Sequence, residues 1–175
     1  ADDPVYDAEG NKLVNRGKYT IVSFSDGAGI DVVATGNENP EDPLSIVKST
    51  RNIMYATSIS SEDKTPPQPR NILENMRLKI NFATDPHKGD VWSVVDFQPD
   101  GQQLKLAGRY PNQVKGAFTI QKGSNTPRTY KLLFCPVGSP CKNIGISTDP
   151  EGKKRLVVSY QSDPLVVKFH RHEPE

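Results

Sequence analysis

The stretch that decides the fold is Thr129-Tyr130-Lys131-Leu132-Leu133-Phe134-Cys135-Pro136, which is followed by Cys141 and by Asn143-Ile144-Gly145-Ile146-Ser147. Apolar and aromatic residues on both sides of a short polar loop predict the two strands of a hairpin. The only two cysteines of the chain flank this loop. Their setting favours a disulfide over a metal site, with two free thiols as the alternative. A bond across so short a loop would stabilise the protein by roughly 2 kcal/mol, so it would reinforce the hairpin locally.

The same alternation of apolar and polar residues recurs along the chain. Period-two patterns rich in β-branched and aromatic residues predict strands, here at residues 19–24, 44–49, 76–82, 91–95, 104–106, 117–120, 130–134, 156–158 and 165–169. Turn signals separate these runs, and no window keeps a helical period over three turns. We therefore expect an all-β chain of about a dozen short strands, in a sandwich or a barrel. Three thirds of about 55–60 residues would suit a β-trefoil, although patterning alone does not separate it from a sandwich.

Composition narrows the classes of partner. The 175 residues fit one domain, 1–175, and carry a formal net charge of +1. A balanced charge argues against nucleic acid as a partner, and no apolar run approaches the ~20 residues that span a bilayer. No signal peptide is visible, and a start left by its removal would fit a secreted or vacuolar protein, as would a disulfide.

No residues for catalysis stand out. The sequence has no G-x-S-x-G, P-loop or H-E-x-x-H pattern. His170 and His172 would share one face of the last strand, but no third ligand lies nearby, so a solvated pair is favoured over a metal site. We expect no catalytic residue, no cofactor and no metal, and therefore a protein that is not an enzyme.

One long polar segment, residues 60–71, interrupts the strands. Its prolines, Pro66, Pro67 and Pro69, fix φ and favour an extended conformation in the residue before each, so the segment should be exposed and stiff. A loop of this length in a compact domain is commonly functional. A basic side chain on it would suit the S1 pocket of a trypsin-like protease, and stiffness lowers the ordering cost of binding. An ordinary surface loop is the alternative.

Over nearly its full length the chain resembles the plant Kunitz inhibitors, the soybean trypsin inhibitor family. Besides the hairpin around Cys135, the stretches that carry the resemblance are Val5-Tyr6-Asp7-Ala8-Glu9-Gly10-Asn11-Lys12-Leu13, Gly17-Lys18-Tyr19-Thr20-Ile21, Thr35-Gly36-Asn37-Glu38, Pro43-Leu44-Ser45-Ile46-Val47-Lys48-Ser49, Val91-Trp92-Ser93-Val94-Val95, Arg155-Leu156-Val157-Val158-Ser159 and Pro164-Leu165-Val166-Val167-Lys168-Phe169. The resemblance implies a β-trefoil of twelve strands. It also implies a monomer that inhibits a trypsin-like serine protease by inserting an exposed reactive loop.

The resemblance places the reactive residues in the polar segment. Aligned from Thr57-Ser58-Ile59-Ser60-Ser61, the P1 residue is Lys64 and the P1′ residue is Thr65. The flanking subsites would be filled by Glu62, Asp63, Pro66 and Pro67. Aligned backwards from residues 76–80 with a short gap, Arg70–Asn71 becomes the rival bond.

The resemblance also assigns a brace. Asn15 matches the asparagine that in this family supports the reactive loop from inside through side-chain hydrogen bonds. We expect it to bond to the backbone of residues 62–66.

The chain departs from the family pattern at the disulfides and beside P1. Asp42 stands where a cysteine of the first family disulfide is expected, so Cys135–Cys141 would be the single disulfide, far from the reactive loop. Glu62, Asp63 and Pro66 are unusual neighbours for a basic P1 residue. These departures keep two alternatives open: a Kunitz-fold storage or binding protein with a degenerate loop, and an inhibitor of a cysteine protease or α-amylase.

Overall fold

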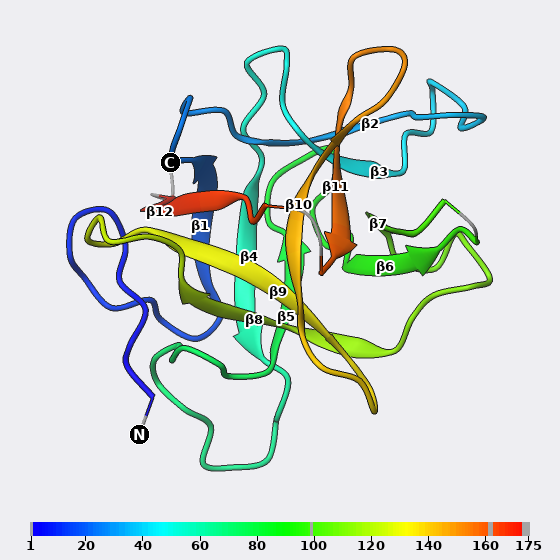
Figure 1. The fold of residues 1–175 in the computed structure, drawn as a ribbon. Helices are drawn as coiled ribbons and strands as arrows, with labels where there is room; N and C mark the ends of the chain where they lie inside the picture. Colours follow the sequence, from blue (N-terminus) through cyan, green and yellow to red (C-terminus); the bar gives the residue numbers. More distant parts are fainter. Residues whose placement is uncertain (1, 99, 161–162, 173–175) are drawn as a thin grey trace.

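The computed structural model describes residues 2–98, 100–160 and 163–172. Strands are the only regular elements in this part of the chain (Figure 1), and no helix in it is long and apolar enough to cross a membrane. The strands are β1 Gly17–Ser23, β2 Ile30–Val33, β3 Ser45–Lys48, β4 Ala56–Ser61, β5 Leu78–Phe82, β6 Trp92–Asp96, β7 Gln102–Leu106, β8 Gly116–Lys122, β9 Tyr130–Pro136, β10 Lys142–Thr148, β11 Lys154–Ser159 and β12 Val166–Arg171.

Six of these strands close a barrel. β1 pairs with β4 and β12, β5 pairs with β4 and β8, and β9 pairs with β8 and β12, always antiparallel. The ring β1-β4-β5-β8-β9-β12 therefore leaves no strand edge unpaired at its closure, which removes the template for edge-to-edge association.

The remaining strands form three hairpins that meet one another. The hairpins are β2–β3, β6–β7 and β10–β11. They contact each other through the pairs β3–β7, β7–β11 and β11–β3. A unit of four strands is thus repeated three times around the barrel, which is the arrangement of a β-trefoil. The all-β prediction is confirmed, and the pairing pattern excludes the sandwich.

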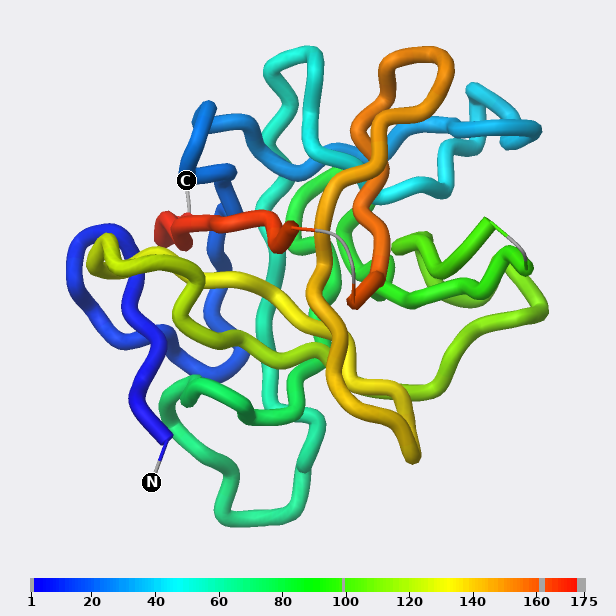
Figure 2. Tube along the Cα trace, in the orientation of Figure 1, coloured from blue at the N-terminus to red at the C-terminus, as the bar shows by residue number. Residues whose placement is uncertain are grey.

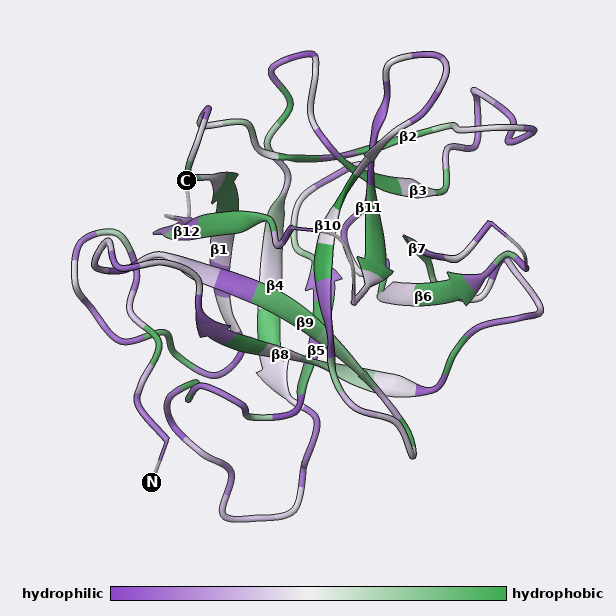
Figure 3. Ribbon diagram, viewed as in Figure 1, coloured by the Kyte–Doolittle hydropathy of each residue, from purple (hydrophilic) through white to green (hydrophobic). Residues whose placement is uncertain are grey.

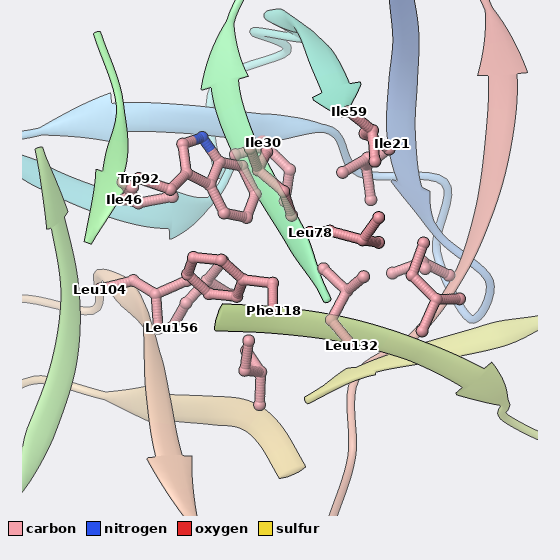
Figure 4. Packing of buried hydrophobic residues seen from close by; sticks show 14 of the residues in the cluster. Ile21, Ile30, Ile46, Ile59, Leu78, Trp92, Leu104, Phe118, Leu132 and Leu156 are labelled. Carbon is pink, nitrogen blue, oxygen red and sulfur yellow. The ribbon is translucent and has the colours of Figure 1, made fainter. Parts of the chain in front are cut away.

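One apolar cluster fills the barrel and the space under the hairpins. Along β5, Leu78, Ile80 and Phe82 are buried while the residues between them are not, as the period of a strand requires. Trp92 and Phe118 meet edge to face in this cluster, with ring centroids 6.0 Å apart (Figure 4). Figure 3 shows the complement, with hydrophilic residues concentrated in the connecting loops. The barrel is therefore a rigid scaffold that carries polar loops.

Candidate functional site

The polar segment found in the sequence is the connection between β4 and β5. These strands are antiparallel neighbours, with Ser61 opposite Leu78, so residues 62–77 leave the barrel and return to it at one place. Figure 1 shows this loop projecting from one end of the molecule. Residues 62–68 are all exposed, whereas Ile72 is fully buried. The first two residues of the predicted segment, 60 and 61, belong to β4. Residues 62–68 are exposed, as predicted.

The return limb of the loop lies against the N-terminal segment (Figure 2). The backbone N–H of Asn15 donates to the carbonyl oxygen of Arg70 at 2.9 Å. Asn71 forms an antiparallel bridge with Val14. Both residues of the Arg70–Asn71 bond are therefore tied by backbone pairing to a neighbouring segment.

Asn15 ties the two limbs of the loop together at their base. Its Oδ1 accepts a hydrogen bond from the N–H of Ser61 at 2.8 Å, and its Nδ2 donates to the carbonyl oxygen of Pro69 at 3.0 Å. The predicted partners in residues 62–66 are wrong, because these contacts lie on either side of that stretch. One amide can bridge the limbs only where both lie within hydrogen-bond reach, which is the base of the loop and not its apex.

The apex is held by side chains of the loop itself. Oδ1 of Asp63 accepts a hydrogen bond from the N–H of Thr65 at 2.9 Å. On the other side of the same peptide bond, Nε2 of Gln68 donates to the carbonyl oxygen of Lys64 at 3.1 Å. Hydrogen bonds from the backbone N–H and the side chain of Thr65 hold the pKa of Asp63 below its ordinary value of 3.8. Gln68 carried no signal in the sequence, because its partner depends on how the loop turns.

Charges at the apex are paired within the loop. Oε2 of Glu62 lies 3.6 Å from Nη2 of Arg77, in a half-exposed ion pair. The N–H of Glu62 also donates to the carbonyl oxygen of Arg77 at 2.9 Å. A groove of about 340 Å³ runs between the two limbs, so the apex is not packed onto the barrel. The result is an exposed cation, Lys64, beside two carboxylates that already have partners.

The predicted disulfide is present at the β9–β10 hairpin. Cys135 and Cys141 are joined, with their Cα atoms 4.0 Å apart. This hairpin approaches the return limb, because a groove of about 630 Å³ is lined by the hairpin together with Asn75 and Arg77, while residues 62–71 do not line that groove. The reason is the barrel order: β5 pairs with β8 and β8 pairs with β9, which brings the end of β9 beside the start of β5.

The two C-terminal histidines lie at the end of β12 and directly after it. His170 is exposed on β12, and the N–H of His172 donates to the carbonyl oxygen of Lys18 at 3.0 Å. In the part of the chain that the structure describes, no group of three or more His, Cys, Asp or Glu side chains could hold a metal ion.

Comparison with known proteins places this geometry in a family. The sequence profile of the legume Kunitz family, described as "Trypsin and protease inhibitor", matches residues 5–171. The chain belongs to this family. Its members are inhibitors of proteases and not enzymes, in agreement with the sequence analysis.

Individual relatives match over almost the whole chain. Trypsin inhibitor 1A of Psophocarpus tetragonolobus is 32% identical over 177 residues, which cover 98% of this chain and 99% of the relative. Trypsin inhibitor A of Glycine max is 36% identical over 190 residues, which cover 99% of this chain and 83% of the relative. Both relatives are plant proteins.

Solved structures of similar proteins have the same fold. A chain in the tetragonal crystal form of the complex of porcine pancreatic trypsin and soybean trypsin inhibitor superimposes with a TM-score of 0.84. It is 37% identical in sequence, and the match covers 98% of this Kunitz chain and 100% of that chain. The β-trefoil and the family resemblance are both confirmed.

Proposed function

We propose that this Kunitz protein inhibits a trypsin-like serine protease by presenting Lys64–Thr65 as a substrate-like peptide bond. The observation that carries the proposal is that Lys64 stands at the exposed apex of a loop whose two limbs are joined by Asn15. Relatives named as trypsin inhibitors, and the match to a trypsin–inhibitor complex, support the class of target. A loop held in its bound shape loses little conformational entropy on binding.

The side chain of Lys64 would enter the S1 pocket and meet its carboxylate. The protease serine would then face the Lys64 carbonyl carbon. Asn15 would hold Ser61 and Pro69 in place on the two sides of the cleavage point, so the new chain ends would stay near each other and could rejoin. Complexes of this kind bury about 1,600 Å² and change shape little on binding. A one-to-one complex with monomeric inhibitor follows from this mode of binding.

Arg70–Asn71 is less suited to the same role. The carbonyl oxygen of Arg70 already accepts the N–H of Asn15, and Asn71 is bridged to Val14. A protease would have to pull this backbone away from the N-terminal segment before it could bind the bond, whereas the partners of the Lys64–Thr65 bond are the exposed side chains of Asp63 and Gln68. Both side chains are basic, so backbone accessibility and not charge favours Lys64 over Arg70.

A second candidate function is supported by the proline pair. Pro66 and Pro67 follow the proposed bond and have no backbone N–H to donate to a protease. A loop that lacks these donors would bind a serine protease less tightly, which favours a family member with a degenerate loop that stores nitrogen or binds another partner. Inhibition of a cysteine protease or α-amylase belongs to the same alternative.

A secreted or vacuolar location fits the same proposal. The Cys135–Cys141 disulfide needs an oxidising compartment to form and persist. The relatives of this protein come from plants. The plant seed is one tissue in which such an inhibitor would act.

Stoichiometric titration tests the proposed function. Trypsin at a concentration well above the expected dissociation constant is titrated with the protein, and residual activity is measured. A linear fall to a one-to-one endpoint is the expected result. Continuous turnover of the loop without loss of trypsin activity would support the degenerate-loop alternative.

A further inference from the structure

Both polar groups of the Lys64–Thr65 peptide bond have partners inside the loop. The Thr65 N–H donates to Asp63, and the Lys64 carbonyl oxygen accepts from Gln68. An aspartate that accepts from the N–H two residues further on is a common turn motif, so by itself it would indicate only a turn. Here a second side chain holds the opposite group of the same bond, and that bond is the one proposed to meet the protease.

The important feature of these two hydrogen bonds is which side of the Lys64–Thr65 bond each partner lies on. Asp63 precedes the Lys64–Thr65 bond, and its partner Thr65 follows it. Gln68 follows the bond, and its partner Lys64 precedes it. Each hydrogen bond therefore crosses the cleavage point. When the peptide bond opens, both can remain as non-covalent links between the two new ends.

We propose that Asp63 and Gln68 are positioning residues that keep the two ends of a cleaved Lys64–Thr65 bond together, so that the bond reforms faster than water hydrolyses it. This inference rests on the proposed function, because it takes Lys64–Thr65 as the inhibitory bond. It assigns a role to an aspartate that would otherwise be an unfavourable neighbour of the P1 residue.

The chemistry shows where such links act. The protease serine oxygen bonds to the Lys64 carbonyl carbon, the bond from that carbon to the Thr65 nitrogen breaks, and the nitrogen takes up the proton that the serine loses. An ester to the protease and a free Thr65 amine result. If the amine attacks the ester carbon, the peptide bond reforms and the serine regains its proton. If water attacks instead, Lys64 ends in a carboxylate and the loop is cleaved. A hydrogen bond that retains the amine beside the ester favours the first outcome.

Glu62 provides a matched control in the same loop. Like Asp63 it is an exposed carboxylate beside Lys64, but its charged partner is Arg77, and in the part of the chain that the structure describes its contacts do not cross the Lys64–Thr65 bond. Any general effect of negative charge on trypsin binding should appear in both acidic residues. An effect on religation should appear only in Asp63.

The test measures net loop cleavage and inhibition together. Wild type and the variants Asp63→Ala, Asp63→Asn, Gln68→Ala and Glu62→Ala are incubated with catalytic amounts of trypsin, and cleavage at Lys64–Thr65 is followed by mass spectrometry. We expect Asp63→Ala and Gln68→Ala to be cleaved about tenfold faster than wild type, as loss of one hydrogen bond of ordinary strength predicts. Asp63→Asn keeps an acceptor oxygen and should behave more like wild type than like Asp63→Ala. Glu62→Ala should stay within about twofold of wild type.

A measurement on the free protein separates this inference from the proposed function. Hydrogen exchange of the Thr65 amide, observed by NMR, should be several-fold faster in Asp63→Ala and unchanged in Glu62→Ala. Unchanged exchange in Asp63→Ala would overturn the inference whatever the inhibitor does. Inhibition at Lys64–Thr65 with equal cleavage of Asp63→Ala and wild type would overturn the inference alone. Cleavage mapped to another bond would overturn the proposed function and this inference with it.

Discussion

Asn15 contributes an acceptor and a donor to the reactive loop, and the two hydrogen bonds reach opposite limbs. Resemblance to the bracing asparagine of the family was enough to select it from the sequence. Its partners, Ser61 and Pro69, could not be predicted in the same way, because the groups that an amide reaches depend on the width of the folded loop. The contacts of Gln68 were missed for the same reason.

Replacement of this side chain should loosen the loop more than the fold. Asn15→Ala leaves the Ser61 N–H and the Pro69 carbonyl without a partner, a loss of about 1–3 kcal/mol for half-buried groups, and touches no core residue. We expect trypsin to cleave the Lys64–Thr65 bond at least tenfold faster, while thermal unfolding shifts by only a few degrees. Asn15→Asp keeps the acceptor and loses the donor, so its cleavage rate should be intermediate. If Asn15→Ala inhibits as well as wild type and is cleaved no faster, Asn15 is not a brace.

Among the elements, the period-two pattern and the hairpin around the two cysteines located most strands, but neither located β2 or β4. Ile30, Asp31 and Val32 of β2 are buried in succession, so the strand has no solvent face to produce alternation. β4 is built mainly from hydroxyl residues, and its buried Thr57 is satisfied by donating to the carbonyl oxygen of Tyr19 at 2.9 Å. Such a strand is stabilised by its hydrogen bonds and neighbours, which a hydropathy pattern does not record.

β7 also contains a buried charge that the sequence did not reveal. Nζ of Lys105 lies 2.8 Å from Oε2 of Glu38, and both side chains are about 95% buried. Nζ also donates to Ser45 Oγ at 2.7 Å. Glu38 comes from the loop at residues 36–43, which reads as an ordinary polar loop and is 67 positions away in sequence. The loop that contains Glu38 and Asp42 is thus attached to β7 by an ion pair.

This ion pair makes part of the stability sensitive to acid. Burial alone would raise the pKa of Glu38, but hydrogen bonds from Lys105, Tyr110, Thr35 and Ser45 outweigh burial and hold the pKa below the ordinary value of 4.5. A carboxyl with a lowered pKa contributes stability above its ordinary pKa and loses it as the pH falls through the lowered value. Glu38→Gln should therefore lower the free energy of unfolding by about 3–5 kcal/mol at pH 7, because Lys105 stays buried without its counter-charge.

The measurement is urea unfolding of wild type and Glu38→Gln between neutral and strongly acidic pH. The difference in unfolding free energy should shrink as the pH falls below 4.5, the ordinary pKa of the carboxyl. A difference that is small at pH 7, or that grows in acid, would show that the pair does not stabilise the loop. Glu41→Gln, in the same loop but exposed, is the matched control and should change little.

The disulfide should reinforce one hairpin without controlling the fold. Cys135 and Cys141 close a loop with a sequence separation of 6, for which chain entropy predicts about 2 kcal/mol. Reduction should lower the free energy of unfolding by that amount and leave the far-ultraviolet circular dichroism of the β-structure unchanged. Loss of the β-signal on reduction would mean that the barrel depends on this bond.

At the scale of the whole molecule, closure of the barrel is the feature that the period-two pattern could not predict. Alternation predicted strands, and the family resemblance predicted the twelve-strand trefoil. The long-range pairs that define it, such as Tyr19 of β1 opposite Arg171 of β12, join residues from the two ends of the chain. Local patterns contain no information on such pairs. The stretches that resemble the family carried it indirectly, because a resemblance in the same order along the chain implies the same set of contacts.

The arrangement of the molecule also separates inhibition from stability. The core lies within the barrel and under the hairpins, while residues 62–68 are exposed at one end. Substitutions at the apex should therefore change binding to a protease without changing the unfolding free energy. This separation allows P1 variants to be compared without correction for misfolding.

The central claim is that Lys64 is the residue that enters the protease. It is tested most directly by the inhibition constant for trypsin of Lys64→Ala, measured beside Arg70→Ala as the control. Loss of a buried charged anchor costs several kcal/mol, so Lys64→Ala should weaken inhibition by orders of magnitude, and Arg70→Ala should leave it nearly unchanged. The reverse ranking would move the inhibitory bond to Arg70–Asn71, and no effect from either variant would contradict the substrate-like account.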